Sequence, residues 1–429
     1  MTIAAKGSPV VLVDKIRIRG YRSIAECDVP LGPLTVLVGF NAAGKSNFLD
    51  ALRFTADALA ASPGHALSVR GGLERVLHHG PATSEAVESF SIELDLELPA
   101  NETGEAKPAS YKFEIGRASS RRSSPMVLRE ECHIKEPDGG GKWFAVSPEG
   151  FTSSSSLSTP ELAERRPRDR LLLQAVSVFD KAFQRLQTAL TSMRFYEFDT
   201  TVLRRIDDDT ERHTTLGPRG EHIGHVLGTL AETMPTVKEH LDSYLRAVVP
   251  QLLGVDERRE EEFSTIRARF WNGDPALGFW EAVNSGKVYP PAPHVDVFQR
   301  QELSEGTLRA AGVLAALFQP GVRHGSIPLV AIEEPETAIH PAKVAALYDA
   351  LEDASAHTQV IATTQSADIL DTEYAKAEHL RLVEMVNGVT RIGELDEHTR
   401  QYLAEQPSML AAMHRQGHLR PADHEQGRR

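Results

Sequence analysis

The sequence is poor in cysteine and has no long apolar run. Only two cysteines, Cys27 and Cys132, occur among the 429 residues, from which we expect neither a disulfide framework nor a four-ligand zinc site, in agreement with a reducing compartment. The longest apolar runs, such as 310–318, fall well short of the roughly 20 residues that cross a bilayer, and the N-terminus lacks the apolar core of a signal peptide. We therefore expect a cytoplasmic protein that makes no use of a membrane.

Basic side chains are in deficit as well. The formal net charge is −13, which argues against a protein coated in positive surface for nucleic acid, because phosphate binding draws on clustered Lys and Arg. Two local clusters stand out, one of Arg117, Arg121 and Arg122 and one within 165–170. Such clusters are also typical of a solvated loop or helix face, so DNA stays an open alternative among the partners.

What the chain does have is the composition of a folded globular protein, with 41% hydrophobic and 25% charged residues. Its length exceeds that of one ordinary domain, so we expect two unequal lobes. Alternating or short apolar stretches predict strands, and apolar spacing of three and four predicts helices. The predicted strands are 13–19, 34–38, 88–98, 111–115, 127–134, 329–332, 359–363 and a hairpin of 380–386 and 389–392, and the predicted helices are 45–58, 161–192, 237–253, one from 304 and one from 341. Within 161–192, Val178 and Phe179 fall on the apolar face.

One motif carries chemistry by itself. The residues Gly39-Phe40-Asn41-Ala42-Ala43-Gly44-Lys45-Ser46 match the pattern G-x-x-x-x-G-K-[ST] between a predicted strand and a predicted helix. Backbone N–H groups of such a loop surround phosphate oxygens, Lys45 neutralises the β- and γ-phosphates, and the hydroxyl of Ser46 binds Mg²⁺. The sequence therefore predicts a site for ATP and Mg²⁺ at this loop.

Two further motifs are ambiguous in isolation. Strand 329–332 ends in the acids Glu333 and Glu334, of which one can hold Mg²⁺ and the next can polarise an attacking water. Acidic pairs after a strand are also common as capping or solvated features. Upstream, Ser304 and Gly306 open an apolar helix, a pattern that suits an ordinary N-cap and equally an anion site.

The order of these motifs resembles the ABC-class ATPases of the RecF, SMC and OLD branch. There, a P-loop of the form G-x-N-x-x-G-K-S-N, here ending at Asn47, precedes an L-S-x-G-x-x-R signature, a strand followed by E-E-P-E, and a strand with a polar switch residue, here Gln365. The opening strand 15–24 is also similar, and the resemblance covers roughly 10–80 and 290–395. It implies an α/β fold: an ABC-type ATPase lobe, with a P-loop parallel sheet and an antiparallel β-subdomain, plus an inserted, mainly helical lobe.

The resemblance also assigns roles to the matched positions. ATP would contact Gly39, Asn41, Ala42, Ala43, Gly44, Lys45, Ser46 and Asn47 of the P-loop. Ser304 and Gly306 would contact the γ-phosphate bound by a second copy, so that a head-to-tail homodimer encloses two ATP molecules. Ser46 and Glu333 would hold Mg²⁺, and Glu334 would be the general base.

Two positions depart from the family pattern. Ala42 stands where Gly is usual, which is a small change if its φ angle is negative. Gln365 occupies the place of a His that contacts the γ-phosphate, and Gln can donate a hydrogen bond but carries no charge and shuttles no proton. The catalytic set is then Glu334, Gln365 and Lys45, and we expect slow hydrolysis or ATP used mainly as a clamp.

The motifs divide the chain into four parts. They are 1–150, the N-terminal part of the ATPase lobe with the β-subdomain; 151–290, the inserted helical lobe; 291–395, the C-terminal part of the ATPase lobe with signature, acidic motif and switch; and 396–429, a C-terminal tail. OLD-like relatives carry a C-terminal nuclease domain, for which the stretch after Gln365 is too short. The resemblance therefore implies a separate effector protein, gated by the ATP-bound dimer in phage defence. The alternatives are a RecF-like DNA repair clamp and an ATP-dependent scaffold with little turnover.

Overall fold

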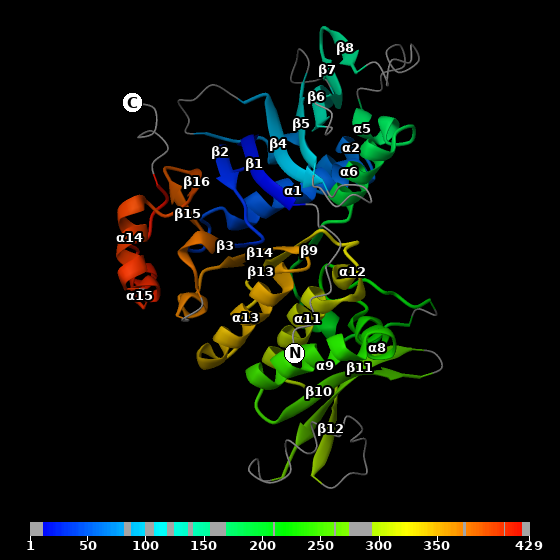
Figure 1. The fold of residues 1–429 in the computed structure, drawn as a ribbon, viewed down its shortest axis with the longest axis vertical. Coiled ribbons are helices and arrows are strands. Elements are labelled where there is room, and N and C mark those ends of the chain that lie inside the picture. Colours follow the sequence, from blue (N-terminus) through cyan, green and yellow to red (C-terminus); the bar gives the residue numbers. More distant parts are fainter. Residues whose placement is uncertain are drawn as a thin grey trace.

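The computed structural model describes residues 12–80, 87–98, 107–117, 124–135, 140–154, 169–208, 211–260, 263–273, 294–371, 375–406 and 408–422. Their strands form three sheets, with helices packed on both faces of the central one (Figure 1). Across these ranges, no helix has both the length and the apolar character of a membrane span.

A six-stranded sheet forms the centre of the molecule. Its order is β16-β15-β3-β14-β13-β9, parallel throughout except for the β15–β16 hairpin. The strands are β3 (Leu34–Val38), β9 (Arg194–Tyr196), β13 (Leu329–Glu333), β14 (Gln359–Thr364), β15 (Leu380–Val386) and β16 (Val389–Gly393). These strands are largely apolar because both faces of the sheet are buried in hydrophobic cores. Leu37 and Ile361 face one core, whereas Val36 and Val360 face the other.

A seven-stranded antiparallel sheet closes the first core. Its order is β2-β1-β4-β5-β6-β7-β8, and its strands are β1 (Leu12–Tyr21), β2 (Ile24–Pro30), β4 (Ser89–Leu98), β5 (Lys107–Gly116), β6 (Met126–Lys135), β7 (Gly141–Ser147) and β8 (Gly150–Ser153). Helix α1 (Lys45–Ala60) contributes Phe48 and Leu52 to the core between the two sheets. The remaining helices of this half are α2 (Pro63–Ser68), α3 (Leu73–Val76), α5 (Leu172–Val176) and α6 (Lys181–Thr191). The P-loop helix is thus fixed by apolar packing along its length.

The second core lies on the opposite face of the central sheet. It is built by α8 (Ile223–Thr233), α9 (Pro235–Val248), α11 (Glu305–Phe318) and α13 (Val344–Ser355), with the short α7 (Thr200–Leu203), α12 (Pro320–Arg323) and the 3₁₀ turns η2 (Pro341–Lys343), η3 (Asp368–Leu370) and η4 (Ala377–His379). A three-stranded antiparallel sheet follows, made of β10 (Leu252–Arg259), β11 (Ser264–Trp271) and β12 (Val295–Gln299). Helices α14 (Glu397–Glu405) and α15 (Met409–Arg415) lie beside the β15–β16 hairpin (Figure 1).

The α/β architecture expected from the motifs is confirmed, including the parallel sheet behind the P-loop and the antiparallel β-subdomain. Strand 34–38 matches β3 residue for residue. The Asn387-Gly388 turn of the predicted hairpin has φ angles of 51° and 82°, as a type I′ turn requires. The division of the chain into four parts stays a prediction.

Segment 151–290 contains strands that the sequence analysis did not predict. Strand β9 belongs to the central sheet, and β10 and β11 pair with each other. The predicted helix 237–253 ends at Val248, because Val249 is extended before Pro250, and a residue before proline is biased away from helical angles. The chain then enters β10 at Leu252.

The apolar face predicted for 161–192 is wrong at two positions. Val178 and Phe179 are 77% and 75% exposed, because they lie in the turn between α5 and α6 rather than on a continuous helix. The first residues of the predicted helix, 161–168, lie outside the described residues, as do most of the two arginine clusters. Arg117 of the first cluster is paired with Glu74.

Candidate nucleotide and magnesium site

The P-loop connects the end of β3 to the start of α1. The N–H of Gly39 donates to the carbonyl of Thr364 at 3.2 Å, which joins the loop to the end of the neighbouring strand β14. Lys45 is almost buried, and its Nζ donates to the carbonyls of Gly39 at 2.7 Å and Phe40 at 3.1 Å. Burial lowers the pKa of Lys45, although Glu334, Glu336 and Glu333 act to raise it. The ammonium group therefore lies inside the loop that a phosphate would occupy.

The β15–β16 hairpin supports the loop from behind. A Cβ on Gly39 would lie 2.2 Å from the carbonyl oxygen of Val383, and one on Gly44 would lie 2.0 Å from Oγ1 of Thr390. Thr390 in turn donates to the carbonyl of Ala43 at 3.0 Å. Both glycines are thus required by close approach of another strand, in addition to any need of the phosphate.

Ala42 adopts a φ angle of 61°. The condition under which Ala would be a small change, a negative φ, is therefore not met. A Cβ in the left-handed region crowds the following carbonyl and costs roughly 1–2 kcal/mol. The loop keeps the conformation that a glycine would favour and accepts this strain.

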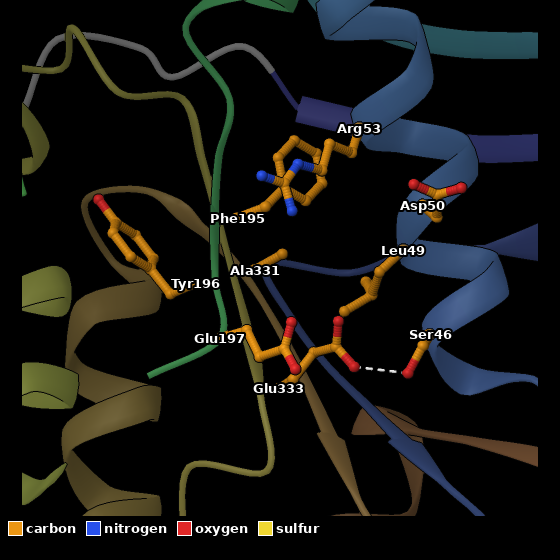
Figure 2. A pocket seen from close by; sticks show the side chains of 9 residues that line it. All are labelled: Ser46, Leu49, Asp50, Arg53, Phe195, Tyr196, Glu197, Ala331 and Glu333. Carbon is orange, nitrogen blue, oxygen red and sulfur yellow. Dashed lines mark hydrogen bonds between the residues drawn. The ribbon is translucent and has the colours of Figure 1, made fainter. Parts of the chain in front are cut away.

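Three oxygen-bearing side chains meet where β13, β9 and α1 come together. Oγ of Ser46 donates to Oε2 of Glu333 at 2.5 Å, and Glu197 lines the same pocket (Figure 2). The pKa of Glu333 is raised, first by burial and further by the nearby Glu197 and Glu334, against the hydrogen bond from Ser46. Clustered carboxylates at raised pKa are relieved by a divalent cation, and oxygen ligands are those that Mg²⁺ prefers.

The sequence did not predict a role for Glu197. It follows the three-residue strand β9, which is too short for a periodicity signal. The available signal was the pattern of an apolar-aromatic pair, Phe195-Tyr196, ending in an acid, the same strand-then-acid order that marks Glu333. Its backbone N–H donates to the carbonyl of Pro218 at 2.9 Å, so a loop from before α8 holds it in place.

Glu334 lies on the other side of the strand end. Its φ angle is 44°, and its N–H donates to the carbonyl of Thr363 at 3.1 Å. Nε2 of Gln365 donates to Oε2 of Glu334 at 3.1 Å. Gln365 therefore contacts the carboxylate that the sequence analysis named as the base, and orients it by a neutral hydrogen bond.

Comparisons with known proteins agree with this arrangement. A model of the family described as "AAA domain, putative AbiEii toxin, Type IV TA system" matches residues 179–371, and a model described as an AAA ATPase domain matches residues 12–95. Both models describe AAA-type domains, and the stretches that they match contain the P-loop and the acidic motif. None of the curated proteins compared with the chain matches it.

Solved structures show that the chain has the fold of an SMC head. It is similar to an Smc head bound to the C-winged helix domain of ScpA, with 13% identity, a TM-score of 0.55, and coverage of 91% of this chain and 99% of that chain. It is also similar to an Smc head domain with an extended coiled coil from Pyrococcus furiosus, bound to the C-terminal domain of ScpA, with 12% identity, a TM-score of 0.52, and coverage of 92% and 99%.

The signature segment of the ATPase begins α11. Ser304 is an exposed N-cap whose Oγ accepts from the N–H of Thr307 at 3.1 Å. Gly306 lies under the chain that follows the acidic motif, since a Cβ there would be 2.4 Å from the carbonyl oxygen of Ala338. Arg309 donates to the carbonyl of Phe198 at 2.8 Å. The signature is thus joined to the loop that follows Glu197.

The remaining P-loop residues are placed differently from one another. Asn41 is exposed. Asn47 points to the first sheet, with its Nδ2 donating to Oγ of Ser23 at 2.6 Å. Oγ of Ser23 also lies 2.7 Å from Oγ1 of Thr390. Asn47 therefore supports the loop through the same threonine that packs on Gly44.

The C-terminal helix α15 reaches the ATPase site, which the sequence analysis did not predict. His414 stacks on Phe40 of the P-loop, with ring centroids 5.3 Å apart and an interplanar angle of 15°. Its Nε2 donates to the carbonyl of Gln365 at 3.1 Å. Burial is the main cause that lowers the pKa of His414, so the ring is neutral at physiological pH. The nearby Arg415 pairs with Asp368 and Asp371 after the switch residue.

Proposed function

We propose that this ABC-like ATPase binds Mg²⁺-ATP, hydrolyses it slowly, and closes into a head-to-tail homodimer that gates a separate effector protein. The observation that carries the proposal is that two adjacent glutamates at the end of β13 have different hydrogen-bond partners. Glu333 contacts Ser46, whereas the next residue, Glu334, contacts Gln365. These contacts support a role for Glu333 in holding Mg²⁺ and a role for Glu334 beside the attacking water.

Nucleotide binding would exchange the contacts of Lys45. Its present acceptors are two carbonyls of its own loop, and phosphate oxygens would replace them with charge-assisted bonds, which are about twice as strong. Ser46 and Glu333 would hold Mg²⁺, and Glu197, which lines the same pocket, would add a further carboxylate to the site. When bound with ATP, the ion would supply positive charge at the γ-phosphate, which favours phosphoryl transfer.

Hydrolysis would start from Glu334. A carboxylate within reach of the attacking water accepts its proton, an effect worth about 10²- to 10⁴-fold in rate. Gln365 holds that carboxylate by an amide N–H, which fixes geometry without offering a positive charge to the γ-phosphate. Because Gln365 orients Glu334 but adds no positive charge beside the γ-phosphate, we expect slow turnover.

The dimer would be completed by the signature. The hydroxyl of Ser304 is exposed at the start of the fourteen-residue helix α11, and such a helix terminus favours an anion. In a head-to-tail pair it would meet the γ-phosphate bound by the second copy. The similar Smc heads are bound to domains of ScpA, and a matching family is described as a putative AbiEii toxin. Both support a partner protein as the effector, in a defence or toxin-like system.

The test compares the intact chain with Glu334→Gln, measuring Mg²⁺-dependent phosphate release and solution mass in the same samples. We expect turnover to fall about 10²- to 10⁴-fold, with ATP still bound and an ATP-dependent dimer that persists longer. Glu352→Gln is the matched control, because Glu352 forms an ion pair with Lys376 at the surface, and such exposed pairs contribute little to stability. Wild-type turnover in Glu334→Gln would exclude Glu334 as the base.

A second variant addresses the dimer. Ser304→Arg places a bulky cation on the exposed end of α11, so it should leave ATP binding to the single chain intact and remove the ATP-dependent doubling of mass. Unchanged doubling would rule out the head-to-tail arrangement.

A further inference from the structure

Four metal-ligand side chains gather at the start of α8, away from the nucleotide site. Asp207 is held by β11, since its N–H and carbonyl each form a 2.8 Å hydrogen bond with Ser264. His222 precedes α8 with a φ angle of 65°, and its N–H donates to Oδ1 of Asp207 at 3.2 Å. His225 is buried one turn into the helix. His213 comes from the loop before it.

The separations suit a compact coordination sphere. One ligand atom each from Asp207, His222 and His225 lie within 4.8 Å of one another. Nδ1 of His222 and Oδ1 of Asp207 are 3.4 Å apart. Ligand atoms around a tetrahedral zinc ion, with bonds of about 2.0–2.1 Å, lie roughly 3.3–3.4 Å apart. One edge of the polyhedron therefore exists already, and the others need a contraction on the order of 1 Å.

The imidazole rings of three histidines stack on one another. His213 and His222 stack with centroids 3.7 Å apart at an interplanar angle of 20°, and both rings are nearly parallel to that of His225. Ring nitrogens of His222 and His225 are thereby brought together beside the carboxylate of Asp207. Imidazole nitrogen is the commonest protein ligand for metal ions.

We propose that Asp207, His222 and His225 bind a divalent transition-metal ion of the zinc class, with the ring of His213 beside it. Two imidazoles and one carboxylate are a donor set for zinc and its neighbours, whereas Mg²⁺ and Ca²⁺ select oxygen ligands alone. Asp207 is bridged to β11, and His222 and His225 lie at the N-terminal end of α8, so the ion would join two elements of the inserted segment.

The loop between His213 and His222 connects the proposed metal site to the candidate nucleotide site. Between His213 and His222, the carbonyl of Pro218 accepts from the N–H of Glu197, and that of Arg219 accepts from the N–H of Asp199 at 3.1 Å. A metal ion would fix the C-terminal end of this loop, at His222, to Asp207. It would thereby stabilise the backbone that holds Glu197 in the nucleotide site.

The experiment uses the full chain without nucleotide. The protein is stripped with a chelator, equilibrated with Zn²⁺, dialysed, and analysed for metal content. We expect about one Zn²⁺ to be retained per chain, and Co²⁺ in its place should give the intense visible absorption of a tetrahedral site. His222→Gln and the isosteric Asp207→Asn should each weaken Zn²⁺ binding at least about 100-fold, with circular dichroism confirming that both variants fold.

Two controls separate this site from the rest of the molecule. His398→Gln removes an exposed histidine on α14, and Glu333→Gln alters the magnesium position, so both should retain Zn²⁺. No retention by the wild type, or wild-type retention by folded His222→Gln, would overturn the proposal. Loss of Zn²⁺ only in Glu333→Gln would assign the metal to the nucleotide site instead. Because the readout needs no ATP, it is independent of the proposed function.

Discussion

Glu333 and Glu334 lie next to each other at the end of β13, but their surroundings differ. We call the surroundings of Glu333 the magnesium side and those of Glu334 the switch side. On the magnesium side, Glu333 is crowded by Glu197 and Glu334, and its pKa is raised. On the switch side, Glu334 receives a hydrogen bond from the neutral amide of Gln365. The surroundings of Glu333 disfavour its charged form, which a bound cation would relieve, whereas Glu334 is oriented by a hydrogen bond without any ligand. Two adjacent glutamates therefore differ in their surroundings, because burial and neighbouring acids act on Glu333, whereas a neutral amide acts on Glu334.

The largest effect should come from a residue that serves both sides. Lys45→Ala removes the cation that faces all three acids of the motif, and we expect the Kd for ATP to rise at least roughly 100-fold, since hydrogen bonds to charged groups are worth about 1.5–3 kcal/mol each. Calorimetric titration with ATP measures it. Lys181→Ala, at an exposed position on α6, should bind ATP normally. Unchanged affinity of Lys45→Ala would mean that nucleotide binds elsewhere.

The magnesium side can be perturbed alone. Glu333→Gln removes a ligand charge, so the Mg²⁺ concentration for half-maximal ATP turnover should rise about 10- to 100-fold, and Glu197→Gln should raise it less. Protons compete with Mg²⁺ for a carboxylate of raised pKa. In the wild type, half-saturation should therefore shift to higher Mg²⁺ as pH falls toward the pKa of Glu333, and Glu333→Gln should flatten this dependence. A Mg²⁺ requirement indifferent to both variants would contradict the assignment.

The switch side should respond in rate and not in metal affinity. Gln365→Ala removes the hydrogen bond that orients Glu334, and we expect kcat to fall about 10-fold, the equivalent of roughly 1.4 kcal/mol. The Mg²⁺ requirement should stay at the wild-type value. If Gln365→Ala instead changed Mg²⁺ affinity and left kcat alone, the two sides would not be separate.

The smallest effect concerns stability. Ala42→Gly relieves the left-handed strain at φ 61° but increases the entropy of the unfolded chain, so a net gain of about 0.5–1 kcal/mol is expected. Thermal unfolding measures it. The adjacent Ala43 is buried and does not have a positive φ, and Ala43→Gly should destabilise by a similar amount. Equal shifts in the same direction would show that backbone strain at Ala42 is not the cause.

The central fold and the local part of the site could be predicted from the sequence. Apolar strands that end in short polar motifs located β3 and β13, because hydrophobic periodicity and motif order are local signals. The β15–β16 hairpin could be predicted from Asn387-Gly388, because a turn sequence is also a local signal.

The rest depended on contacts between distant segments. His414 reaches Phe40 and Gln365 through packing that no spacing encodes. His222 and His225 lie beside Asp207 only in the folded chain, where Asp207 is hydrogen-bonded to Ser264 of β11. Glu197 gave no signal because β9 is only three residues long. The helix predicted for 237–253 runs two residues into β10, although the residue before Pro250 is biased away from helical angles.

The support that the β15–β16 hairpin gives to the P-loop has an evolutionary consequence. Oγ1 of Thr390 fills the space beside Gly44, and the backbone of Val383 fills the space beside Gly39. Selection for nucleotide binding should therefore act on a hairpin that touches no nucleotide. Among descendants of this sequence, position 390 should admit Ser or Thr and resist larger side chains, so sequence drift at this position is restrained by a loop that lies far earlier in the chain.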